Sequence, residues 1–260
     1  MSEVRPMTTA PPASGLPEPA RVLAVIPARL ASTRLPRKVL RELNGQPLLA
    51  WVVEAALCCR QVAKVVVAAD SEEVAELCAA RGWPCVITSP ELPSGSDRLF
   101  AVSRELDADI YLNIQADEPL LEPAHIDALL RPFADPAVSV TTLKVRCPAE
   151  AIADPNVVKV VTAPNGRALY FSRAAIPFHR DDQPATYWKH QGLYAYRKAA
   201  LARFATLQPG ELEQIERLEQ LRLLENGIDI FVVESAQDTI GVDTEEDLRR
   251  VAALLATSSR

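Results

Sequence analysis

"VLAVIPARLASTRLPRKVL" (residues 22–40) joins the two features from which the fold and the site follow. Its first part, Val22 to Pro27, is a short apolar run rich in β-branched residues, which is typical of a strand buried on both faces. The second part carries Arg29, Arg34, Arg37 and Lys38, with Arg41 just beyond. The whole chain has a formal net charge of -6 at pH 7. A stretch of cations in an acidic protein indicates a ligand that is small and anionic.

Further apolar runs follow the first along the chain. "KVVVAA" (64–69), "WPCVIT" (83–88), "DIYLNIQ" (109–115) and "VSVTTLKV" (138–145) are predicted strands. One helix is expected from Pro47, and another from an N-cap at Ser71 to Gly82. Strands alternating with helices predict an α/β protein with a mostly parallel sheet and flanking helices.

The pattern changes after about Pro148. Two strand-like segments flank Asn165-Gly166, a strong hairpin signal, and residues 187–197 alternate like another strand. We expect one amphipathic helix over residues 211–227, a strand at 228–234, and a last helix with a capping box at Thr244 and Asp247. These patterns predict a disordered tail at residues 1–20 and one domain at 21–260. A β-rich lobe at about 148–200 is expected over the open end of the sheet.

Composition excludes several classes of protein. The chain has 260 residues, of which 48% are hydrophobic and 24% charged, as in ordinary globular proteins. It contains no apolar run of membrane-spanning length, and its start lacks the apolar core of a secretory signal. The five cysteines are odd in number and lack CxxC spacing, so reduced thiols in the cytoplasm are expected. The acidic balance argues against a nucleic-acid partner.

The cationic loop follows the first strand directly, and ligands of open α/β sheets bind at the carboxyl ends of strands. An ordinary solvated loop is the alternative interpretation. Pro27 and Pro36 stiffen the segment, while Ala28, Ala31 and Ser32 allow backbone amides to approach a ligand. Such a loop suits a triphosphate. It is neither a GxxxxGK nor a GxGxxG motif.

Carboxylates are expected at the same edge of the sheet. "NIQADEPLL" (113–121) runs from a buried strand into Asp117 and Glu118, and Asp243 precedes the last helix. Hard oxygen ligands beside phosphates suit Mg²⁺, although a turn or an N-cap would explain each acid equally well. Together with the loop, the acids predict a magnesium-nucleotide site.

At these residues the chain resembles the 3-deoxy-manno-octulosonate (Kdo) cytidylyltransferases, which are similar to the CMP-sialic acid synthetases. The resemblance extends from Val22 to about Leu255. It is carried by these motifs, in family order: "IPARLASTRLPRK", "PSGSDRL", "NIQADEPLL", "NVVKVV", "ALYFSRAAIP", "KHQGLYAYR", "LEQLRLLENG" and "GVDTEEDL".

The resemblance implies an enzyme that couples CTP to an acidic eight-carbon sugar for lipopolysaccharide synthesis, with Mg²⁺ as cofactor and a homodimer as the assembly. It implies a nucleotide site of Ala28, Arg29, Ser32, Arg34, Lys38, Ser94, Gly95, Arg98 and Gln115. The implied metal carboxylates are Asp117 and Asp243, which with Lys38 form the catalytic set. The implied sugar pocket consists of Arg173, His190, Tyr194, Glu219 and Gln220, with Arg173 opposing the sugar carboxylate.

Other interpretations of the sugar-pocket residues remain open. His190 could pack in a half-buried strand, and Tyr194 and Tyr196 are taken to face opposite sides of that strand, so that at most one meets a ligand. Glu213, Glu216 and Glu219 could form the solvated face of one helix.

The chain departs from the family pattern at four positions. Arg37 replaces a glycine and is expected to disfavour a left-handed backbone. Ala116 replaces another glycine next to the nucleotide, Leu92 replaces a histidine, and Gln191 replaces an apolar residue.

Three alternative functions remain. The first is a cytidylyltransferase for a related sugar, such as an amino-substituted octulosonate or a nonulosonate. The second is a non-catalytic nucleotide-sugar binder. The third is a glycosyltransferase that uses the DxD-like "DAD" of Asp107 to Asp109, although that motif precedes its strand instead of ending it.

Overall fold

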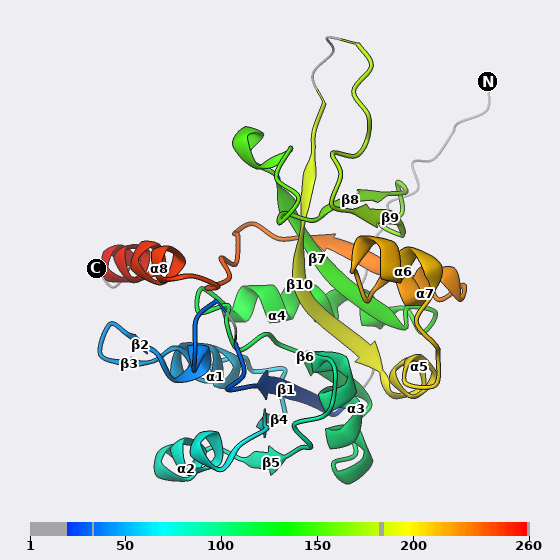
Figure 1. Cartoon of the computed structure of the whole chain (residues 1–260). Coiled ribbons are helices and arrows are strands. Elements are labelled where there is room, and N and C mark those ends of the chain that lie inside the picture. The colour runs from blue at the N-terminus through cyan, green and yellow to red at the C-terminus, as the bar shows by residue number, and fades with distance from the viewer. Residues whose placement is uncertain (1–19, 33, 182–184, 259–260) are drawn as a thin grey trace, which may run out of the picture.

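The first strand of the protein, β1 (Val22–Ala28), leads at its carboxyl end into the cationic loop (Figure 1). The computed structural model describes residues 20–32, 34–181 and 185–258. Every residue of β1 is buried. The strand pairs in parallel with β4 (Lys64–Ala69) on one side and β6 (Ile110–Asn113) on the other. The carboxyl ends of these three predicted strands therefore open at one edge of the sheet.

Within the described residues the sheet has nine strands, seven of them in the order β11, β7, β10, β6, β1, β4, β5. The parallel pairs are β1 with β4 and β6, β4 with β5, and β7 with β11, while β10 runs antiparallel to β6 and β7. The four strands of this order not yet located in the sequence are β11 (Phe231–Glu234), β7 (Val140–Arg146), β10 (Trp188–Arg197) and β5 (Cys85–Ile87). The prediction of an α/β fold with a mostly parallel sheet is confirmed.

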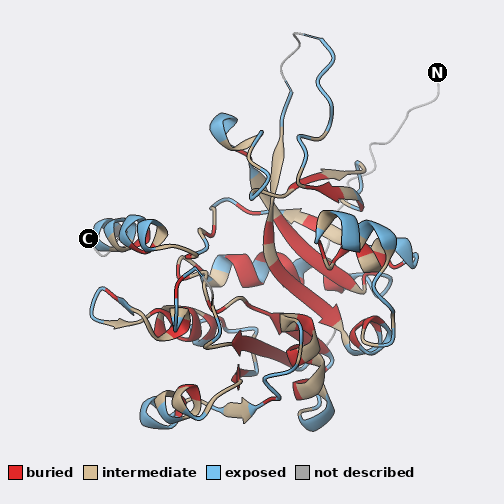
Figure 2. Ribbon diagram, in the orientation of Figure 1, coloured by how far each residue is buried: buried red, intermediate tan, exposed pale blue. Residues whose placement is uncertain are grey.

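Helices cover both faces of the sheet, and Figure 2 shows the buried residues concentrated in the strands between them. One face packs against α1 (Leu48–Leu57), α2 (Glu72–Arg81) and α4 (Pro123–Leu130). The other packs against α3 (Gly95–Glu105), α5 (Lys198–Phe204) and α7 (Leu221–Glu225). The 3-10 helices are η1 Lys38–Leu40, η2 Arg131–Ala134 and η3 Ala149–Ala151. Ser71 and Gly82 cap α2 as predicted.

The predicted helix over residues 211–227 is wrong as a single element. It is divided into α6 (Glu211–Glu216) and α7 by Arg217, whose φ of 54° lies in the left-handed region. Sequence patterns did not indicate α3, α4 or α5. The break turns Glu216 towards Ser172 and Glu219 towards Ser96, two partners on different elements. One solvated helical face for Glu213, Glu216 and Glu219 is therefore also wrong.

The segment predicted as a β-rich lobe has two parts. The predicted hairpin is formed by β8 (Lys159–Thr162) and β9 (Ala168–Ser172), with Gly166 at a φ of 86° in its turn. Strand β10 instead enters the central sheet between β6 and β7 (Figure 1). The assignment of residues 21–260 to one domain stays a prediction, and residues 1–19 of the expected tail lie outside the described residues.

The last helix, α8 (Glu245–Ser258), begins at the predicted capping box. The Asp247 amide donates to Thr244 Oγ1 at 3.1 Å, and the Thr244 amide donates to Asp247 Oδ2 at 2.9 Å. Val242, Leu248 and Val251 pack against the small β2 (Glu42–Leu43) and β3 (Gln46–Pro47) hairpin region through Leu43. This packing places Asp243 above the sheet edge. No helix in the described ranges is both long and apolar enough to cross a membrane.

Candidate active site

A cleft of about 360 Å³ opens at the carboxyl edge of β1 and β6. It is lined by these predicted site residues: Arg29, Ser32, Arg34, Lys38, Gly95, Gln115, Asp117 and Asp243. Pro27, Ala31, Val39 and Ala116 complete its wall. The structure thus brings the cationic loop, the end of β6 and the start of α8 together around one cavity, as parallel strand ends require.

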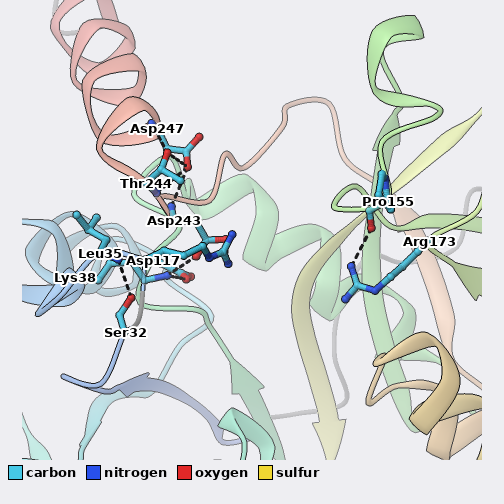
Figure 3. A network of polar contacts seen from close by, with 10 residues as sticks. Ser32, Leu35, Lys38, Asp117, Pro155, Arg173, Asp243, Thr244 and Asp247 are labelled. Carbon is cyan, nitrogen blue, oxygen red and sulfur yellow. Dashed lines mark hydrogen bonds and ion pairs between the residues drawn. The ribbon is translucent and has the colours of Figure 1, made fainter.

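Two carboxylates converge in this cleft on one ammonium group (Figure 3). Lys38 Nζ donates to Asp117 Oδ2 at 2.5 Å and to Asp243 Oδ1 at 2.9 Å. Arg34 donates to the other oxygen of Asp243, also at 2.9 Å. A backbone hydrogen bond holds the segments of the two acids together, because the Val242 amide donates to the Asp117 carbonyl at 2.8 Å.

The charges of the cluster stabilise one another. Burial alone would lower the pKa of Lys38, but the Asp117 and Asp243 carboxylates outweigh burial and raise it. Burial would likewise raise the pKa of Asp243, but Lys38 and Arg34 lower it overall. Ammonium and carboxylate therefore stay ionised at neutral pH.

A buried pair beneath the loop fixes where the loop leaves the sheet. The Leu30 amide donates to Asp70 Oδ1 at 3.1 Å, and Asp70 directly follows β4. Arg98 is fully buried, donates to Thr88 Oγ1 at 2.6 Å, and has NH2 3.9 Å from Asp70 Oδ2. Burial lowers the pKa of Arg98, and its Nε and NH2 have no hydrogen-bond partner in the part of the chain that the structure describes. Arg98 is thus buried behind the cleft and does not line it. Asp70 was not predicted as a site residue, although its position directly after a strand could have indicated one.

The other predicted nucleotide residues shape the cleft through the backbone. Ser94 caps α3, accepting from the Asp97 amide at 3.1 Å. Gly95 begins that helix, and a Cβ there would lie 3.5 Å from Pro27. Ala28 is buried in the core at the end of β1. The first turn of α3 therefore faces the loop across the cleft.

A second cavity, of about 610 Å³, adjoins the first and shares Arg29 and Gly95 with it. It lies between the start of α3 and α6, and Glu219 is the one predicted sugar residue in its wall. Glu219 accepts from Ser96 Oγ at 2.6 Å. Arg217, a residue that no sequence motif indicated as part of a site, also lines it. Two substrates bound in adjoining cavities would meet at the shared wall.

His190 and Tyr194 form a hydrogen-bonded group on β10. His190 Nε2 lies 3.0 Å from both Thr142 Oγ1 and Tyr194 Oη. Burial, with Lys189 nearby, lowers the pKa of His190 to about 3, so the ring is neutral at neutral pH. The rings of Tyr194 and Tyr196 stack 5.8 Å apart. The expectation that they face opposite sides is wrong, because residues two apart in a strand share a face.

Arg173 and Gln220 do not line the first cleft. The Arg173 guanidinium donates to the carbonyls of Glu216 at 2.7 Å, Pro155 at 2.9 Å and Arg217 at 3.3 Å. In Figure 3 the Arg173–Pro155 contact is separate from the Lys38 cluster. Gln220 is buried at the start of α7. The structure thus gathers the residues predicted to bind phosphates and metal tightly, and disperses the predicted sugar residues.

The four departures from the family pattern have different surroundings. Arg37 has a φ of 56° and a ψ of 33°, so the left-handed conformation that we expected it to disfavour is present. Gln191 is buried and donates to the Gln237 carbonyl at 3.1 Å, which gives its polar side chain a partner. Ala116 lines the cleft and Leu92 is half-buried in the turn before α3.

An α/β sheet whose strand ends place a cationic loop against two converging carboxylates defines a protein of the nucleotidyltransferase class. The sequence profile described as "Cytidylyltransferase" matches residues 23–230. A 3-deoxy-manno-octulosonate cytidylyltransferase of Acidobacterium capsulatum is 63% identical over 90% of this chain and 96% of its own. Another, from Koribacter versatilis, is 51% identical over 92% and 95%. The chain therefore belongs to the 3-deoxy-manno-octulosonate cytidylyltransferase family.

A solved structure supports the same assignment. It is described as CMP:2-keto-3-deoxy-manno-octonic acid synthetase complexed with CTP, and it matches with a TM-score of 0.89 at 42% identity. The match covers 92% of this chain and 100% of the other. A cytidylyltransferase from Leptospira borgpetersenii, at 15% identity and a TM-score of 0.63, shares the fold.

Proposed function

We propose that this protein transfers the cytidylyl group of CTP to the anomeric hydroxyl of 3-deoxy-manno-octulosonate, giving CMP-Kdo and pyrophosphate for lipopolysaccharide synthesis. The observation that carries the proposal is the cleft in which the loop cations face Asp117 and Asp243. Relatives that carry this activity in their names match almost the whole chain. Cytoplasmic location and a homodimer stay predictions.

The triphosphate is assigned to the first cleft. Arg29, Arg34 and Lys38 supply positive charge there, and Ser32 adds a hydroxyl. A triphosphate carries several negative charges, and these must be neutralised before a hydroxyl can approach the α-phosphorus. Fixed cations do this without reorganising during the reaction. We therefore assign binding and orientation of the phosphates to these side chains.

The residues of the cleft fit magnesium as the cofactor. The described chain holds no group of three or more His, Cys, Asp and Glu side chains that could form a closed metal cage. Mg²⁺ is commonly held by one or two carboxylates together with substrate phosphates, and Asp117 and Asp243 already converge on one cation, the Lys38 ammonium. These two acids would hold the ion, which when bound neutralises the phosphates and orients them.

The sugar is assigned to the adjoining cavity. Its anomeric hydroxyl would lose its proton to solvent as the oxygen attacks the α-phosphorus at the wall formed by Arg29 and Gly95, and the bond to the bridging oxygen of pyrophosphate would break. Arg29 is then positioned beside the transferred phosphoryl group. Glu219, held by Ser96, offers an acceptor to sugar hydroxyls. Recognition by Arg173, His190, Tyr194 and Gln220 stays a prediction.

The motif on which the glycosyltransferase alternative depends does not lie in the cleft. Asp107 and Asp109 precede β6, at the edge of the sheet opposite the cleft. Both contact Arg21, and Asp107 also pairs with Lys198. Carboxylates neutralised in surface ion pairs away from the cleft do not form a metal site for the reaction.

The test is pyrophosphate release from a matrix of substrates. Each of four nucleoside triphosphates is combined with Kdo, its 8-amino analogue and sialic acid, with and without Mg²⁺. Release with CTP plus Kdo is the expected result. A preference for another acidic sugar would support the related cytidylyltransferase. No release from any pair would support the non-catalytic binder and refute the proposal.

A further inference from the structure

Lys38 occupies the position between the two acids that the proposed function assigns to the metal. Its ammonium contacts one oxygen of Asp117 and one of Asp243, at 2.5 and 2.9 Å. The Lys38 side chain is only 13% exposed, whereas those of Asp117 and Asp243 are 30% and 44% exposed. The Lys38 side chain is therefore the most enclosed of the three.

The two acids need a cation whether or not a metal is present. They come from segments far apart in the chain, and the backbone bond from Val242 to Asp117 holds them close. Two neighbouring carboxylates without a cation repel each other, and one of them tends to take up a proton. Arg34 pairs with the other oxygen of Asp243, Oδ2, and therefore offsets only part of this repulsion. Among the described residues Lys38 alone contacts both acids.

We propose that Lys38 is an internal counter-cation, which holds Asp117 and Asp243 together in the free enzyme and moves to the phosphates when magnesium and CTP bind. The proposal rests on the metal assignment of the proposed function. Lys38 lines the same cleft as Arg29 and Ser32, and its four-carbon stem lets the ammonium turn without moving η1. Divalent metal without CTP must displace this ammonium and therefore binds weakly.

The test measures metal binding in the absence of CTP and sugar. Mn²⁺ binding is followed by the electron paramagnetic resonance signal of free Mn²⁺, and Mg²⁺ binding by calorimetry. Lys38→Met should bind both ions about tenfold more tightly than the parent protein, the effect expected when a competing charge-assisted contact is removed. Arg41→Gln is the matched control, since Arg41 pairs with Glu245 and lies outside the cleft lining. It removes the same charge nearby and should change affinity by less than about twofold.

A second readout separates the competing role from a direct role in metal binding. The melting temperature of metal-free Lys38→Met should be lower than that of the parent, and Mg²⁺ should raise it by more than it raises the parent's. Lys38→Gln serves if the methionine variant does not fold. Unchanged or weaker Mn²⁺ binding in the variant would overturn the proposal. Absence of pyrophosphate release from every substrate pair would overturn the proposed function only, because these measurements use no substrate.

Discussion

Replacing Asp117 or Asp243 by asparagine tests whether these two acids act as one unit in the reaction. Asparagine keeps the shape of the side chain and removes its charge. Lys38 donates to both acids, at 2.5 and 2.9 Å, so either single change leaves it one carboxylate partner. No buried ammonium is orphaned, and the free energy of unfolding should fall by only about 1–2 kcal/mol.

The effect on turnover should be far larger than the effect on stability. Removing one preorganised electrostatic contact of a transition state typically costs about a hundredfold or more in rate, and each single variant should lose about this much. The double variant should lose much less than the product of the two, because both changes damage one site. Here the close approach of both acids to a single ammonium predicts strong non-additivity.

The assay is continuous pyrophosphate release at saturating CTP and Kdo, with thermal unfolding measured in parallel. Asp107→Asn is the control, because this acid pairs with Arg21 and Lys198 at the opposite edge of the sheet and should keep normal turnover. Near-normal turnover of the double variant that EDTA still abolishes would refute the reasoning and place the metal on other ligands.

Three further outcomes follow from buried contacts. Asp70→Ala removes the acceptor of the Leu30 amide, so KM for CTP should rise about tenfold while KM for Kdo stays constant; equal changes in both would contradict this. Arg173→Ala should raise KM for Kdo and, because three carbonyls lose their donor, lower stability by about 1–3 kcal/mol in denaturant titrations. Burial and the charge of Asp117 raise the pKa of Glu118 to about 8. Between about pH 4.5 and 8 the unfolded chain therefore releases a proton that the folded protein keeps, and stability falls as pH rises. Calorimetric melting temperatures of Glu118→Gln should lack this decline.

The strands of the sheet were the most predictable part of the structure. The runs at 22–27 and 64–69 match β1 and β4 closely, because strands buried on both faces must be continuously apolar. Caps at Ser71, Gly82 and Thr244 were equally local signals. The helix α3 was missed because its apolar residues lie among polar ones and become recognisable as a core-facing set only when they pack on the sheet.

The α/β class, the cationic loop and the acids of the first cleft could be predicted from the sequence, because strand ends and loop composition are local properties. The tertiary structure alone decided which groups meet: that Lys38 lies between Asp117 and Asp243, that Arg98 is buried beneath the loop, and that the Arg173 guanidinium is satisfied by backbone carbonyls. The break of the predicted helix at Arg217, with Glu216 bound to Ser172 and Glu219 bound to Ser96, was likewise visible only in the tertiary structure. Hydrogen bonding and desolvation depend on neighbours that are distant in the chain. The periodicity of apolar and polar residues does not reveal which distant residues become neighbours.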